Sequence, residues 1–100
     1  MNDPFAIEGS HVLVTGGSSG LGRFFAVFLA ARGARVTVAA RRADALSKTV
    51  DGIANANGQA QSVVMDVTVP ASIEAALDTA EARFGPVDIV INNAGVTATR

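Results

Sequence analysis

The sequence predicts an α/β fold of the Rossmann type, a doubly wound parallel sheet with helices on both faces. Two observations support this prediction. Short apolar segments alternate along the 100 residues with segments of helical period, and the connections between them are brief. In addition, a glycine-rich turn, "TGGSSGLG", joins the first apolar segment to the first helical one.

Apolar runs without polar alternation are typical of strands that are buried on both faces of a parallel sheet. The first run, "HVLVTG", ends in glycine, and the second, "ARVTVAA", is rich in β-branched residues. "QSVVMDV" and "VDIVINN" are the third and fourth runs. We therefore expect four strands, at residues 11–16, 34–40, 61–67 and 87–93.

The first expected helix follows the glycine turn and ends at Gly33. Its large apolar residues recur at i, i+3, i+4, i+7 and i+8, so we expect them to form the face that packs on the sheet. These residues are Leu21, Phe24, Phe25, Phe28 and Leu29.

Two further helices are expected. One covers residues 42–57, with Leu46, Val50 and Ile53 on one face and Gly58 as its stop. The other begins at Pro70 and ends at Gly85. Its apolar stripe consists of Ile73, Ala76, Leu77, Ala80 and Phe84.

Composition points to one soluble unit, so we treat residues 1–100 as a single domain or part of one. The chain is 49% hydrophobic, its formal net charge is -1, and it contains no cysteine. A disulfide framework, a zinc–thiolate site and a thiol nucleophile are thereby excluded, and a nucleic-acid partner is not indicated. The longest apolar run, residues 24–31, is shorter than the ~20 residues that span a bilayer, and the N-terminus does not resemble a secretory signal. We expect a cytoplasmic protein with no membrane partner.

The glycine turn is a candidate anion site, because it places backbone N–H groups and a helix N-terminus at the carboxyl edge of the sheet. A nucleoside-triphosphate loop is excluded, since Arg23 and Phe24 stand where that loop has Lys and Ser or Thr. The spacing G-x-G-x-x-G is also absent. The pattern that fits is T-G-x-x-x-G-x-G, from Thr15, Gly16, Gly20 and Gly22.

Together with Asp66-Val67 at the end of the third strand and "NNAG" (residues 92–95) at the end of the fourth, this pattern resembles the short-chain dehydrogenase/reductase family. The similarity runs from about Gly9 to the last residue. Ser19 stands where the extended branch of that family has glycine, which favours the short branch. The resemblance implies a sheet order of 3-2-1-4 and makes this span the N-terminal, cofactor-binding part of a Rossmann-type domain.

The resemblance also implies roles for individual residues. Glycines would admit the cofactor pyrophosphate, serines would donate to its oxygens, Leu21 would lie below the nicotinamide ribose, and Asp66 would accept from the adenine amino group. Leu21 fits equally well as the first core residue of its helix, and Asp66 as a loop residue. Asn93 is expected nearer the cofactor than Asn92. The implied cofactor residues are Gly16, Ser18, Ser19, Gly20, Leu21, Gly22, Arg41, Arg42, Asp66, Val67, Asn93, Ala94 and Gly95.

The end of the second strand bears on the choice of cofactor. An NAD site places Asp or Glu there, about twenty residues after the glycine turn, to bind the ribose 2′-hydroxyl. In this sequence Ala40 stands at that position, and Arg41 and Arg42 follow. A guanidinium group can bind a 2′-phosphate through charge-assisted hydrogen bonds, although both arginines would also suit a solvated helix start. We expect NADP(H) to be preferred, with NAD(H) possible.

The family's reaction transfers hydride between NADP(H) and a ketone, secondary alcohol or 3-oxoacyl substrate, using a Tyr, a Lys and a Ser. This chain has no Tyr, Lys48 is its only Lys, and no Ser follows Ser72, so no catalytic residue is assigned and no metal is expected. We expect the N-terminal part of such an oxidoreductase, which as an intact protein would be a homo-oligomer, a tetramer or dimer. The alternative is a non-catalytic NAD(P)-binding module. His11, at the amino end of its strand, is expected at the surface.

Overall fold

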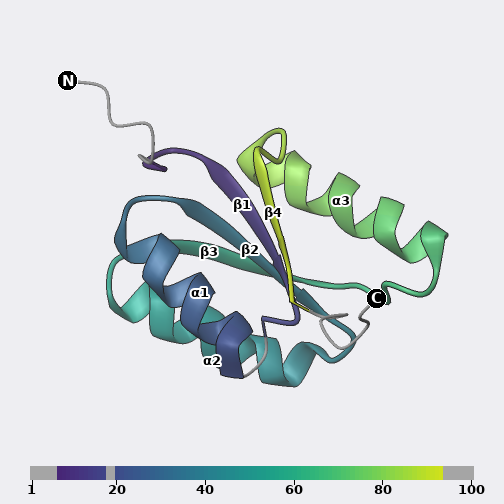
Figure 1. The fold of residues 1–100 in the computed structure, drawn as a ribbon, viewed down its shortest axis with the longest axis horizontal. Coiled ribbons are helices and arrows are strands. Elements are labelled where there is room, and N and C mark those ends of the chain that lie inside the picture. Colours follow the sequence, from purple (N-terminus) through teal and green to yellow (C-terminus); the bar gives the residue numbers. More distant parts are fainter. Residues whose placement is uncertain (1–6, 18–19, 94–100) are drawn as a thin grey trace.

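A four-stranded parallel sheet in the order β3-β2-β1-β4 lies at the centre of the protein (Figure 1). The computed structural model describes residues 7–17 and 20–93. The strand order and the parallel pairing confirm the predicted fold class. The strands are β1 (His11–Thr15), β2 (Arg35–Ala40), β3 (Gln59–Val64) and β4 (Ile89–Asn92).

Helices cover both faces of this sheet, as a doubly wound fold requires. α1 (Gly20–Ala31) and α2 (Ala43–Asn55) lie on one face, and α3 (Pro70–Phe84) lies on the other (Figure 1). The predicted start of α3 at Pro70 is confirmed, as is its end at Gly85, where the backbone φ is 81°. Within the described ranges, no helix is long and apolar enough to cross a bilayer.

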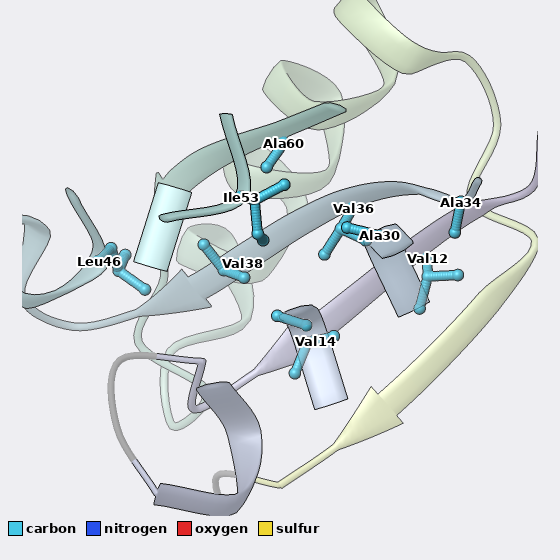
Figure 2. Packing of buried hydrophobic residues seen from close by; sticks show 10 residues of the cluster. Val12, Val14, Ala30, Ala34, Val36, Val38, Leu46, Ile53 and Ala60 are labelled. Carbon is cyan, nitrogen blue, oxygen red and sulfur yellow. The ribbon is translucent and has the colours of Figure 1, made fainter. Parts of the chain in front are cut away.

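The core between the sheet and the helix pair α1–α2 is built from valines on the strands and from alanine, leucine and isoleucine on the helices (Figure 2). Alternate residues of β1 and β2 point to this face because side-chain direction in a strand has a period of two. Buried members of this core include Val12, Val14, Val36, Val38, Ala26, Ala30, Leu46 and Ile53.

The opposite face carries a second, smaller core beneath α3. It contains Leu13 of β1 and Ala39 of β2, which alternate with the valines of the first core. Ala76 and Ala80 of α3 pack on them, with Ile73 and Leu77 partly buried at the margin. The stripe predicted for α3 is therefore confirmed.

The stripe predicted for α1 is wrong for Leu21, Phe24 and Phe28, which are exposed, whereas Leu29 is partly buried and packs against the core. Leu21 and Phe24 are 57% and 59% exposed, whereas the buried residues of this helix are Gly22, Ala26 and Ala30. The fully buried positions of the helix thus hold only small side chains, and the larger Leu29 is only partly buried. Leu21, Phe24 and Phe28 are exposed instead, and the rings of Phe24 and Phe28 stack with their centroids 6.0 Å apart.

The bounds of β3 also differ from the prediction. The strand pairs with β2 from Gln59 onward, where Gln59 is opposite Arg35, and it ends at Val64. The N–H of Met65 still donates to the carbonyl of Ala40, at 2.9 Å. Asp66 therefore lies in the loop after the strand.

His11 is buried, which corrects the prediction that it lies at the surface. Its side chain has 0% exposure and lies in edge-to-face contact with the ring of Phe84, at 5.4 Å between ring centroids. Its Nδ1 atom is 2.8 Å from the carbonyl oxygen of Gly85. The end of α3 and the residue after it therefore cover the amino end of β1, which position along the strand alone did not indicate.

A buried polar network links this histidine to β2, β3 and α3. Because the Gly85 carbonyl can only accept, Nδ1 of His11 carries a proton, and in the neutral ring Nε2 accepts from the hydroxyl of Thr37 at 2.7 Å. Gln61 Nε2 donates to the same hydroxyl oxygen at 2.9 Å and to the carbonyl of Ala80 at 3.0 Å. Thr37 is thus the centre of a network that joins the strands to α3.

We expect Thr37→Val to lower the free energy of unfolding of the intact protein by about 1–3 kcal/mol, because it leaves buried nitrogens of His11 and Gln61 without their partner. Chemical denaturation measures this change. Thr79→Val is the matched control, because the Thr79 hydroxyl is exposed and bonds to the carbonyl of Ala75 in its own helix. If Thr37→Val lowers the free energy of unfolding no more than Thr79→Val does, the stabilising role of this network is contradicted.

Candidate functional site

The candidate site lies at the carboxyl edge of the sheet. Because all four strands are parallel, their C-terminal ends meet at this edge, and ligands of open α/β sheets bind there. The residues that follow the strands are Gly16 after β1, Arg41 after β2, Met65 after β3 and Asn93 after β4. Helix α1 begins at this edge with Gly20.

The glycine loop after β1 is held by main-chain contacts. Gly16 has a φ of 72°, which favours glycine, and its N–H donates to the carbonyl of Ala39 at 2.7 Å. A Cβ atom at Gly22 would overlap the carbonyl oxygen of Gly16 and would lie 2.9 Å from Nδ2 of Asn93. The first turn of α1 therefore packs directly against the loop, and only glycine permits that approach.

Two asparagines after β4 hold the other side of the loop. The side-chain oxygen of Asn92 accepts from the hydroxyl of Thr15 at 2.9 Å. The backbone N–H of Asn93 donates to the same hydroxyl at 3.1 Å, and its side-chain Nδ2 donates to the carbonyl of Gly16 at 3.4 Å. Asn92 thus braces the neighbouring strands and Asn93 contacts the glycine loop, while the expected place of Asn93 near the cofactor stays a prediction.

A cavity of about 650 Å³ opens between the ends of β1, β2 and β3. This volume is typical of a site for a small organic ligand. Gly16 forms one wall, Ala40 and Arg41 a second, and Met65 with Asp66 a third. The predicted residues from three separate segments are therefore brought together around one space.

Both signs of charge line the rim of the cavity at the end of β2. Ala40 is the last residue of the strand, so the position of a ribose-binding carboxylate is apolar, as the sequence indicated. Arg41 and Arg42 follow, both exposed, and Arg42 is the N-cap residue of α2. Asp44, in the first turn of that helix, lines the same cavity.

Asp66 is held in an Asx turn by Thr68. The hydroxyl and the backbone N–H of Thr68 donate to Oδ1 of Asp66 at 2.6 and 3.0 Å. These two bonds hold the pKa of Asp66 below its ordinary value of 3.8, and the charge of Arg41 lowers the pKa further while partial desolvation opposes the shift. No hydrogen bond from a described residue reaches Oδ2, so this oxygen of a charged carboxylate is available to a ligand's donor.

The remaining predicted residues divide into those the structure describes and those it does not. Leu21 is 57% exposed at the start of α1, so it is not part of the core between α1 and the sheet, and its contact with the nicotinamide ribose stays a prediction. Val67 is 43% exposed and lines the cavity. Four predicted residues lie outside the described residues, namely Ser18, Ser19, Ala94 and Gly95.

Sequence analysis missed Thr49 and Thr68. Thr68 anchors Asp66, and the pattern D-x-T was a usable signal, because Thr two residues after Asp commonly closes such a turn. Thr49 of α2 donates from its hydroxyl to the carbonyl of Gly17 at 2.9 Å. Its signal was weaker: it lies between Leu46 and Ile53 on the buried face, where the sequence analysis considered only apolar residues.

The fold and the edge site define a doubly wound α/β protein with a glycine loop, and comparison with known proteins identifies its family. The family model described as short chain dehydrogenase matches residues 10–100. This chain belongs to that family, as its motifs indicated.

Relatives and solved structures agree with this assignment. The chain is 46% identical over 90 residues to "3-oxoacyl-[acyl-carrier-protein] reductase FabG" of Escherichia coli, an alignment that covers 90% of this chain and 36% of the relative. It is 37% identical to the crystal structure of hydroxysteroid dehydrogenase from Escherichia coli, with a TM-score of 0.86 and coverage of 89% and 38%. An actinorhodin polyketide ketoreductase variant solved with NADPH is 38% identical, with a TM-score of 0.82 and coverage of 86% and 33%. The chain thus spans a little over a third of the curated relatives that it matches.

We expect Thr68→Val to raise the pKa of Asp66 toward 3.8, because the substitution removes the strongest bond to its charged form. Since the folded-state pKa is lowered, the carboxylate adds stability above its ordinary pKa, and that stability is lost as the pH falls through the lowered value. Carboxyl NMR titration of the intact protein measures the shift. Thr79→Val should leave the pKa of Asp66 unchanged. A Thr68→Val protein in which Asp66 keeps the pKa that it has in the unaltered protein would contradict the role given to Thr68.

Proposed function

We propose that the intact protein is an oxidoreductase that transfers hydride between NADP(H) and a ketone, a secondary alcohol or a 3-oxoacyl substrate, and that this chain supplies the cofactor site. The observation that carries the proposal is the cavity at the sheet edge, where Arg41 and Asp66 face a glycine loop. Family membership supports the reaction class. Two relatives, a 3-oxoacyl-[acyl-carrier-protein] reductase and a 7alpha-hydroxysteroid dehydrogenase, support the substrate class.

The residues present fit a nicotinamide dinucleotide. The glycine loop and the N-terminus of α1 would receive the pyrophosphate, because backbone N–H groups and the helix dipole favour an anion there. Oδ2 of Asp66 would accept from the adenine amino group, and Val67 would flank the ring. Leu21 and Asn93 would lie toward the nicotinamide ribose. The bound cofactor would supply or accept the hydride, and no residue of this chain is proposed to act as the acid or base.

The preference for NADP(H) is supported by the end of β2. Ala40 provides no carboxylate for a ribose 2′-hydroxyl, and the guanidinium groups of Arg41 and Arg42 can bind a 2′-phosphate. Asp44 lines the same cavity and opposes that charge in part. The two positive charges of Arg41 and Arg42 still outnumber the one negative charge of Asp44. A solved structure that resembles this chain, a metagenomic short-chain oxidoreductase, is described as a complex with NADP.

Further parts of the proposal concern the intact protein. We propose a small-molecule substrate and a homo-oligomer, a tetramer or dimer. We also propose a cytoplasmic location, with neither nucleic acid nor membrane as a partner. Size-exclusion chromatography with light scattering tests the assembly, and a monomer would contradict it.

Arg41→Ala should weaken NADPH binding about 10- to 100-fold and change NADH binding less than twofold, because the variant removes a charge-assisted contact to the 2′-phosphate only. Fluorescence titration of the intact protein with each nucleotide measures both constants. Arg32→Ala is the matched control, since Arg32 follows the far end of α1 and contacts the ring of Phe28.

Three outcomes contradict separate parts of this proposal. Tighter binding of NADH than NADPH by the unaltered protein overturns the cofactor preference. Failure to bind either nucleotide overturns the site itself. Binding without oxidation of NADPH in the presence of ketones and 3-oxoacyl thioesters favours the alternative, a non-catalytic NAD(P)-binding module.

A further inference from the structure

Thr49 occupies an unusual place on α2. It lies on the buried face of the helix between Leu46 and Ile53, and only 1% of its surface is exposed. A hydroxyl group at such a position costs free energy unless it is hydrogen-bonded. Its contacts therefore show what the residue does.

The hydroxyl of Thr49 does not bond within its own helix. Ser47 and Thr79 show the ordinary arrangement, in which a helical hydroxyl donates to the carbonyl four residues earlier. Thr49 instead donates at 2.9 Å to the carbonyl of Gly17, which is 32 positions earlier in the chain. The bond ties α2 to the glycine loop.

Arg23 of α1 completes a relay. Its Nε donates to the oxygen of Thr49 at 3.2 Å, so the hydroxyl accepts from a guanidinium group while it donates to Gly17. A hydroxyl that accepts a charge-assisted bond becomes a stronger donor, because linked hydrogen bonds polarise one another. The relay therefore joins α1, α2 and the loop through one side chain.

The loop is fixed from several sides at Gly16 and Gly17. A Cβ at Gly17 would lie 2.8 Å from Cβ of Val38, so the backbone there rests directly on β2. The carbonyl of Gly16 accepts from Asn93 and the carbonyl of Gly17 accepts from Thr49. Because a peptide unit is planar, holding its carbonyl fixes the orientation of the whole unit.

We propose that Thr49 is a positioning residue for dinucleotide binding: its hydroxyl holds the Gly17 carbonyl and so pre-shapes the start of the glycine loop, at Gly16 and Gly17, for the cofactor pyrophosphate. Thr49 does not line the cavity, so it acts through the loop and not by contact with the ligand. A loop ordered before binding loses less conformational entropy when the ligand arrives, which raises affinity. The inference rests on the proposed function, since it concerns the same site.

Thr49→Val tests the inference in the intact protein, because valine keeps the shape of the side chain and removes the hydroxyl. We expect the dissociation constants for NADPH and NADH to rise by the same factor, about tenfold, so that their ratio is unchanged. Adenosine 2′-monophosphate, which has no pyrophosphate, should bind as it does to the unaltered protein. Thr49→Ser keeps the hydroxyl and should restore binding to within about twofold.

Thr37→Val is the matched control, because it removes another fully buried threonine hydroxyl with side-chain partners, away from the loop. It should lower stability and leave both nucleotide constants unchanged. If Thr49→Val does not fold, Thr49→Ala, which also lacks the hydroxyl, takes its place and is compared with Thr49→Ser.

The outcomes separate this inference from the proposed function. Normal nucleotide affinity in a folded Thr49→Val or Thr49→Ala protein overturns the inference and leaves the proposed function intact. If Thr37→Val loses as much nucleotide affinity as the Thr49 variants, the inference is also overturned, since the loss of affinity would then follow from lowered stability alone. Failure of the unaltered protein to bind any dinucleotide overturns both.

Discussion

The close contact between Gly22 and the carbonyl of Gly16 sets how near the first turn of α1 lies to the end of β1. No side chain fits between them, because a Cβ at position 22 would overlap the carbonyl oxygen. The contact brings the first turn of α1 onto the loop after β1. It also leaves room for Nδ2 of Asn93, which donates to the same carbonyl of Gly16 at 3.4 Å.

The same closeness determines the composition of α1. Gly22, Ala26 and Ala30 repeat every four residues along the face that packs on the sheet, so the helix can stay near β1 over its whole length. The fully buried positions of that face hold no large side chain, and Phe24 and Phe28 lie at exposed positions of the helix. A further exposed apolar residue is Val90 of β4, which is 58% exposed and lies on the opposite side of the sheet from α1. The described residues thus leave apolar surface on more than one side.

Sequence patterns predicted the alternation of elements well because that signal depends on period and glycine position alone. Pro70 and Gly85 bounded α3 correctly for the same local reason. The patterns failed where tertiary distance decided the outcome. The five-residue apolar stripe of α1 looked like a core face, yet the fully buried positions of the helix are glycine and alanine, and of the stripe Leu29 packs against the core. His11 was buried by Phe84, a residue 73 positions away, and Thr49 bonds to Gly17 across a gap that no local pattern records.

The two halves of the proposed site, the glycine loop and the rim at the end of β2, depend on different kinds of contact. Its glycine loop is shaped by backbone atoms and by neutral partners such as Asn93 and Thr49, none of which distinguishes one dinucleotide from another. The rim at β2 is shaped by Ala40 and by the charges of Arg41 and Asp44, which can respond to a 2′-phosphate. No described hydrogen bond links Thr49 with Arg41. Substitutions at the loop should therefore alter the affinity for both dinucleotides, and substitutions at the rim should alter the preference between them. Their effects on the binding free energy should be nearly additive. In the proposed binding mode, the loop determines how tightly a dinucleotide is held, and the rim determines which one.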